Sequence, residues 1–287
     1  MVKKISLIFS IFILVFCLFT NSCDRNDLLG LFSSLDLDER LKEKDKFVLL
    51  GEDPSDGKYN LDPNLFNPAL GDNYSFLLVT DTHLEEDKTH GLEKLVDVVT
   101  TDTKIRFVVI TGDITQKGAE KEIDNFIKIA EDMGVPVIPV IGNHDFYFDN
   151  WKYWRDKIGS TMYRIDSDST TLIILDSGNA FYGKSQLDWL EKQMGSTQKY
   201  VFVFSHSNLF VTDIYNMQQT TSTYERARIV NLLRNKCNIM FMGHTHKDQY
   251  NKVGGVDYVV LEGFIETKAY YIYTVNGSSI TRTKHKL

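Results

Sequence analysis

Five short polar groups carry most of the histidine in this chain, and each group follows an apolar run. Five of the seven histidines lie in these groups, with three aspartates and one asparagine. The groups are Asp81 with His83, then Asp113, then Asn143 with His144 and Asp145, then His206, then His244 with His246. Imidazole, carboxylate and amide groups together suit first-row transition metals, whereas a calcium site would need more carboxylates. The set therefore predicts a site for a pair of such metals.

The elements that must position these groups alternate between short apolar runs and amphipathic stretches, which indicates an α/β fold. We expect strands at 75–80, 105–111, 137–141, 171–175, 200–204, 239–242, 258–261 and 269–274, and helices at 92–100, 119–133, 185–193 and 224–235. The polar groups follow five of these strands, at the carboxyl ends where open α/β sheets build their sites. The first three groups are one βαβ unit apart, so right-handed crossovers would bring their loops together.

The ordered motifs Asp-x-His, Gly-Asp, Gly-Asn-His-Asp, His and Gly-His-x-His resemble those of the calcineurin-like metallophosphoesterase superfamily. The resemblance covers about residues 74–287. It extends to the bacterial class III cyclic nucleotide phosphodiesterase branch, which shares Thr-Gly-Asp-Ile-Thr at 111–115 and a stretch with Gly183, Gln186-Leu187 and Trp189-Leu190. The fold implied by this resemblance is a four-layer αββα sandwich with mixed sheets.

The resemblance also implies a role for each residue of the five groups. Seven would be metal ligands in two sets that share one carboxylate: Asp81, His83 and His246 for one metal, Asn143, His206 and His244 for the other, and Asp113 for both. His144 would be the catalytic acid, oriented by Asp145. Asp145 also fits a loop carboxylate that caps the following helix.

The cofactors implied are two divalent or mixed-valence metal ions, manganese, iron or zinc. Two cations that share Asp113 would trap a hydroxide and so generate a nucleophile at neutral pH. That hydroxide would attack phosphorus in line, while His144 would donate a proton to the leaving alkoxide. The predicted activity is hydrolysis of a phosphodiester or a phosphomonoester, with a cyclic-nucleotide type of diester as one candidate.

The motifs also narrow the branch and the substrate. Protein Ser/Thr phosphatases of this superfamily carry Asp-x-His-Gly and Asp-Arg-Gly, where this chain has Leu84 and residues 116–118. Purple acid phosphatases would show a tyrosine ligand in place of Gln116. The formal net charge of −7 and the few basic residues in the ligand loops disfavour nucleic acid as a partner. We expect a small phosphoester substrate. The alternative is a lipoprotein that binds a phosphorylated ligand or partner through the metal site with little or no turnover.

The first 23 of the 287 residues have the pattern of a lipoprotein signal peptide. Lys3 and Lys4 precede an apolar run at 5–19, and the sequence at 20–23 resembles a lipobox in which Cys23 is lipidated. The run is shorter than the ~20 residues that a membrane-spanning helix needs, although an uncleaved short anchor remains an alternative. We therefore expect an extracytoplasmic protein of the bacterial cell envelope, attached to a membrane by its lipid.

Residues 24–73 are rich in charged and turn-forming residues, which predicts a tether and an irregular lead-in. Within it, 28–37 and 47–50 are apolar enough to form a short helix and a strand that dock on the main domain at 74–287.

The lipidation site can be tested directly. Cys23→Ser should abolish incorporation of a clickable fatty acid and leave the precursor uncut, because the thiol is the only group there that could accept the lipid. In-gel fluorescence and the size of the chain in envelope fractions measure both effects. Labelling that persists in the variant would place the lipid elsewhere.

Overall fold

The computed structural model describes residues 37–42, 65–210 and 219–287. The expected signal peptide, Cys23, and the strand at 47–50 lie outside the described residues, as does all but the last residue of the helix expected at 28–37. In the lead-in the structure shows one short helix, α3 (Leu37–Arg40). Among the described residues, no helix is long and apolar enough to cross a membrane.

The first sheet has five strands in the order β11-β10-β1-β2-β3. The strands are β1 (Asn73–Val79), β2 (Ile105–Thr111), β3 (Val137–Val140), β10 (Ala269–Asn276) and β11 (Ser279–Lys286). The first three run parallel, and β10 pairs antiparallel with β1. The sheet therefore presents the ends of β1, β2 and β3 at one edge.

The second sheet has six strands in the order β4-β5-β6-β7-β9-β8. The strands are β4 (Tyr163–Asp166), β5 (Thr170–Ile174), β6 (Tyr200–Phe204), β7 (Ile239–Met242), β8 (Gln249–Val253) and β9 (Val256–Val260). The four central strands are parallel, and the two edge strands run antiparallel to them. Both sheets are therefore mixed.

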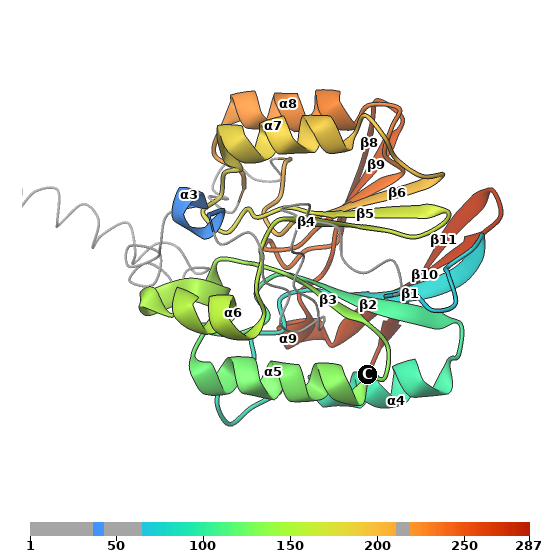
Figure 1. Cartoon of the computed structure of the whole chain (residues 1–287). Coiled ribbons are helices and arrows are strands. Elements are labelled where there is room, and N and C mark those ends of the chain that lie inside the picture. Colours follow the sequence, from blue (N-terminus) through green and yellow to red (C-terminus); the bar gives the residue numbers. More distant parts are fainter. Residues whose placement is uncertain (1–36, 43–64, 211–218) are drawn as a thin grey trace, which may run out of the picture.

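Helices cover the outer face of each sheet (Figure 1). The five-stranded sheet carries α4 (Leu95–Thr101), α5 (Glu120–Asp132) and α6 (Trp151–Lys157), and the six-stranded sheet carries α7 (Gly183–Gln193) and α8 (Thr223–Leu233). Shorter turns are η1 (Leu92–Lys94), η2 (His144–Asp149) and α9 (Phe264–Thr267).

Three apolar cores separate these layers. The central core lies between the sheets and is strongly aromatic, with Phe76 stacked on Phe107 and in contact with Phe202. The two outer cores join each sheet to its helices. This arrangement confirms the four-layer αββα sandwich and buries the central strands of both sheets on both faces, which is why these strands are continuous apolar runs.

The sequence placed the central strands well but missed three strands. Strands β2, β6 and β7 have the expected bounds, whereas β4, β8 and β11 were not expected. The last two alternate between partly buried and exposed residues, so they contain no apolar run. Edge strands with one solvated face are stabilised by their neighbours and give a weak sequence signal.

Candidate metal centre

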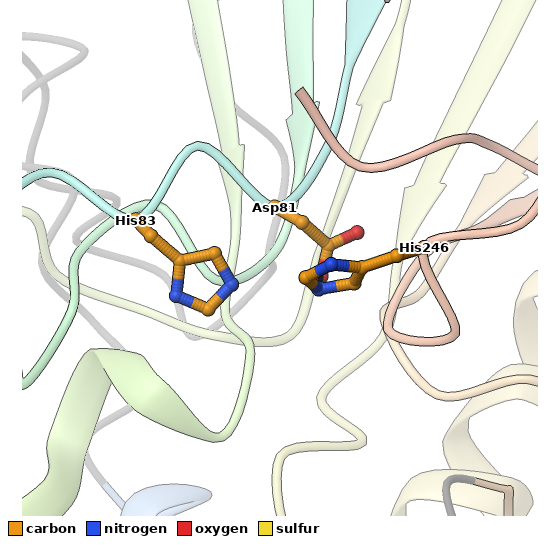
Figure 2. A group of neighbouring side chains, drawn as sticks. All are labelled: Asp81, His83 and His246. Atoms are coloured by element: carbon orange, nitrogen blue, oxygen red, sulfur yellow. Dashed lines mark ion pairs between the residues drawn. The ribbon is translucent and has the colours of Figure 1, made fainter. Parts of the chain in front are cut away.

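The first ligand group combines residues from two loops that are far apart in the sequence. Asp81 and His83 follow β1, and His246 follows β7. Their ligand atoms lie within 4.8 Å of one another, and Nε2 of His246 is 3.2 Å from Oδ1 of Asp81. Figure 2 shows the imidazole of His246 beside the carboxylate of Asp81, with the ring of His83 pointing toward them. The structure thus assembles the first predicted ligand set.

The second group consists of Asp113, His206 and His244, again with ligand atoms within 4.8 Å. Nε2 of His206 lies 3.0 Å from Oδ2 of Asp113 and 3.0 Å from Nδ1 of His244. The same Oδ2 atom is 3.9 Å from Nε2 of His83 in the first group. Asp113 therefore lies between the two groups, in the position predicted for a bridging carboxylate.

Two buried atoms at this centre have no hydrogen-bond partner. They are Nε2 of His83 and Oδ1 of Asn143. A buried polar atom without a partner costs about 1–3 kcal/mol, so such atoms mark places where a ligand belongs. The backbone N–H of His144 donates to Oδ1 of Asp113 at 2.9 Å, which holds the Asn143 loop against the bridging carboxylate. The donor types and these two atoms fit a pair of transition-metal ions.

Outer hydrogen bonds fix the orientation of three ligand histidines. Nδ1 of His83 faces Oε1 of Gln116 at 2.9 Å, and Nδ1 of His206 faces the carbonyl of Thr111 at 2.9 Å. Nδ1 of His246 faces Oε1 of Glu266 at 2.6 Å. Because all three partners accept, each Nδ1 carries the proton and each Nε2 is left for the metal.

Gln116 and Glu266 are therefore positioning residues that the sequence did not reveal. Gln116 was considered only as the residue that stands in place of a tyrosine ligand. Glu266 lies on α9, 20 residues after the histidine that it orients, and no motif links the two.

The predicted acid lies beside both groups. His144 belongs to a third set of close ligand atoms with His83 and Asp113, and its ring centroid is 4.6 Å from that of His83. Its Nδ1 faces the backbone carbonyl of Gln116 at 2.8 Å. This carbonyl therefore helps to orient the ring.

The hydrogen bonds of the Asp145 carboxylate run to loop residues other than His144, and the expectation that Asp145 orients the acid stays a prediction. Its carboxylate accepts hydrogen bonds from the backbone N–H and hydroxyl of Thr115, at 2.8 and 2.9 Å, and from the N–H of Gly142 at 2.8 Å. It does not cap the following helix. It joins the loops after β2 and β3.

Burial and paired charges shift the pKa values of the ligands. Burial alone would raise the pKa of Asp81, but the imidazoles of His246 and His206 lower it to about 2. Burial alone would lower the pKa of the two histidines, but Asp113 raises that of His206 to about 9 and Asp81 raises that of His246 to about 11. Burial and the neighbouring His144 lower the pKa of His83 to about 4. Without metal, two imidazolium groups thus balance two carboxylates.

The ligand loops have an unusual backbone conformation. Positive φ angles occur at five of the seven predicted ligands: Asp81 (52°), His83 (47°), Asp113 (48°), His244 (69°) and His246 (52°). This region costs an L-residue roughly 1–2 kcal/mol, and such strain concentrates at functional sites. A Cβ on Gly142 would lie 2.2 Å from Oδ1 of Asp113, so only glycine allows this loop to approach the bridging carboxylate.

Comparisons with known proteins agree with this geometry. Residues 74–248 match the family Calcineurin-like phosphoesterase. A probable cyclic nucleotide phosphodiesterase from Rhodopseudomonas palustris is 25% identical over 218 residues, 68% of this chain and 80% of that protein. A protein of the same name from Fibrobacter succinogenes is 25% identical over 151 residues, 49% of this chain and 57% of that protein. A probable glycerophosphodiester phosphodiesterase from Arcobacter nitrofigilis is 26% identical over 193 residues, with 59% and 70% covered.

Solved structures show the same fold. A dimetal phosphatase from Danio rerio has a TM-score of 0.61 at 15% identity, covering 74% of this chain and 95% of its own. A purple acid phosphatase from yellow lupin has a TM-score of 0.62 at 15% identity, covering 75% of this chain and 51% of its own.

Metal binding should release protons from His206 and His246. At about pH 7 the metal-free forms of His206 and His246 are protonated, because their pKa values are about 9 and 11. Filling both sites should therefore release about two protons from these imidazoles, besides the proton lost when bound water becomes hydroxide, and the affinity of the His206 site should rise with pH up to about 9. Calorimetric titration of the metal-stripped full chain with Mn²⁺, in buffers of different ionisation enthalpy, counts the protons.

The variant His246→Gln is the matched control and should lower the release by about one proton, since a glutamine side chain carries no titrating proton. Binding of two metals with no proton release at about pH 7 would show that these imidazoles are neutral beforehand.

Proposed function

Because the chain belongs to the calcineurin-like phosphoesterase family, we propose that it is a hydrolase that uses two metal ions to cleave a phosphodiester. The observation that carries this proposal is the position of Asp113 between two groups of close ligand atoms, together with the buried atoms of His83 and Asn143 that have no partner. Asp81, His83 and His246 would hold one ion, Asn143, His206 and His244 the other, and Asp113 both. When bound, such ions polarise phosphoryl oxygens and lower the pKa of water.

The residue proposed to handle the leaving group is His144. A backbone carbonyl can only accept a hydrogen bond, so the carbonyl of Gln116 keeps a proton on Nδ1 of His144 in both charge states. The proton that is gained and lost is therefore on Nε2. We assign proton donation to a departing alkoxide to this ring atom, and such donation is worth typically ~10²- to 10⁴-fold in rate.

Charge at the centre favours a diester over a monoester. In the part of the chain that the structure describes, the carboxylates of Asp81 and Asp113 form ion pairs only with histidines. A phosphomonoester dianion would bring two negative charges toward these carboxylates, whereas a diester brings one, and the ligand loops hold few basic residues. The printed names of the bacterial relatives, which are cyclic nucleotide and glycerophosphodiester phosphodiesterases, support the same substrate class.

We also propose that the enzyme acts outside the cytoplasm, held to a membrane of the cell envelope by lipid on Cys23. The support is the order of charged, apolar and small residues at the start of the sequence. A lipid anchor would confine hydrolysis to phosphoesters at the membrane surface.

The substrate class can be tested with the purified full chain in detergent, loaded with Mn²⁺. Hydrolysis of bis(p-nitrophenyl) phosphate should exceed that of p-nitrophenyl phosphate. Asp113→Asn is the control for contaminating activity, because loss of the bridging charge should empty at least one site. Monoester preference would make the protein a phosphatase. No hydrolysis of either ester or of alkyl diesters would favour a protein that binds phosphorylated ligands without turnover.

Removal of the proposed acid should depend on the leaving group. His144→Ala should retain two metals but lose about tenfold more activity on an alkyl diester, such as 3′,5′-cyclic AMP or a glycerophosphodiester, than on bis(p-nitrophenyl) phosphate. The reason is that p-nitrophenolate departs without a proton. Metal analysis and kcat/KM on both substrates measure the two effects.

His285→Ala provides a histidine control, because His285 stacks on Tyr270 and belongs to none of the three ligand groups. Equal losses on both ester classes for His144→Ala, or loss of metal, would argue against its role as an acid.

A further inference from the structure

A fully buried ion pair joins the lead-in to the main domain. Nε of Arg40 donates to Oδ2 of Asp176 at 2.9 Å, and Nη2 donates to Oδ1 at 2.7 Å. Arg40 is 1% exposed and Asp176 is completely buried. Within the described residues, no other Lys or Arg ion pair has both side chains inaccessible. Burial of two charges carries a large desolvation cost, so a buried pair is weak evidence of stability and calls for another role.

The arginine reaches the domain from a short docked helix. Leu37, the first residue of α3, and Leu41, the residue after the helix, pack with Met162. A Cβ on Gly183 would lie 3.2 Å from Cδ2 of Leu37, which shows how closely α3 meets the start of α7. In Figure 1, α3 appears between α7 and α6. This helix precedes residue 74, where the match to the phosphoesterase family begins.

The guanidinium also touches the loop that carries the acid. Its central carbon lies 3.9 Å from the ring centroid of Phe146, which is a cation–π contact. A Cβ on Gly178 would lie 2.5 Å from Cε1 of Phe146 and 3.3 Å from Nη2 of Arg40. The N–H of Gly178 in turn donates to Oδ1 of Asp176 at 3.0 Å. Arg40, the loop after β5 and the ring of Phe146 therefore form one packed unit.

The loop needs such an anchor because its own backbone is irregular. Phe146, Tyr147 and Phe148 have non-helical dihedral angles, so the segment 144–149 lacks the regular hydrogen bonds of a helix. Phe146 is fully buried, and the next residue, Tyr147, accepts a hydrogen bond from Asn143 and packs on the ring of His144 at 4.5 Å. The position of Phe146 thus sets the positions of a metal ligand and of the acid.

We propose that Arg40 is a positioning residue for the catalytic loop, acting through Phe146. The segment that precedes the phosphoesterase domain thereby completes the active site. The kinetic part of this inference rests on the proposed function, whereas its structural part does not.

The structural part is tested by hydrogen–deuterium exchange on the metal-free full chain. Arg40→Met should speed exchange of the amides at 143–149 by about tenfold, because the ring of Phe146 loses its contact. Arg164→Met is the matched control. Arg164 forms a similar two-bond ion pair with Asp166, at 2.8 and 3.0 Å. Asp166 lies opposite Thr171 at the start of β5, whereas Asp176 follows the end of β5. The control should leave exchange at 143–149 unchanged.

Arg40→Met leaves a buried charge on Asp176 and can impair folding, so two further variants decide the question. The double variant Arg40→Met, Asp176→Asn removes both charges. Gly178→Ala keeps both charges but displaces the ring of Phe146. Each should loosen 143–149 while the melting temperature stays within the range of Arg164→Met. Unchanged exchange at 143–149 in both of these folded variants would overturn the proposal.

The kinetic part uses the Mn²⁺-loaded full chain. Gly178→Ala and the double variant should keep two metals and lose about tenfold more activity on the alkyl diester than on bis(p-nitrophenyl) phosphate, as expected for a misplaced acid. Equal losses on both substrates would overturn the link to His144. An inactive parent would contradict the proposed function, and exchange at 143–149 would still decide the role of Arg40.

Discussion

Two ionised carboxylates, Asp81 and Asp113, lie almost completely buried where the two sheets meet, and the rest of the centre is arranged around their charge. Isolated buried carboxylates would be protonated, because desolvation disfavours the charged form. Here the imidazoles of His246 and His206 keep the pKa of Asp81 low, and those of His206 and His144 keep the pKa of Asp113 low. Metal ions would replace the protons on the imidazoles of His206 and His246 with a larger positive charge, so the same carboxylates suit a metal site.

The sandwich is what allows ligands from two sheets to meet at these carboxylates. Strands β1, β2 and β3 deliver three loops from one sheet, and β6 and β7 deliver two from the other. The aromatic core between the sheets fixes their separation, so the loops meet in a fixed register. Left-handed backbone at most of the ligands turns the side chains inward, and Gly142 allows close approach at Asp113. Local strain in the loops is thus supported by the rigid layers behind them.

Residues outside the predicted ligand set determine how the ligand and acid side chains are oriented. Gln116 serves both a ligand and the proposed acid, since its side chain faces His83 and its carbonyl faces His144. Asp145 holds two loops together, and Phe146 anchors the segment that follows. Through Arg40 this support extends to a helix outside the region shared with the family. Precise placement of the centre therefore depends on residues well beyond those that would touch metal.

The sequence by itself determined the central strands and the five polar groups of the centre, because buried strands are apolar runs and these groups stand directly after them. The order of the layers and the choice of seven ligands came from the resemblance of the motifs to the family. The tertiary structure decided the contacts that join distant segments. Arg40 and Asp176 are 136 residues apart, and His246 and Glu266 are 20 apart, so no local pattern could reveal either pair. Asp145 shows the same limit: it lies next to His144 in the sequence, but only the folded loops show that its carboxylate accepts from three backbone and hydroxyl donors. Local physics fixes where chain elements begin and end, whereas packing between elements chooses the partner of each buried polar group.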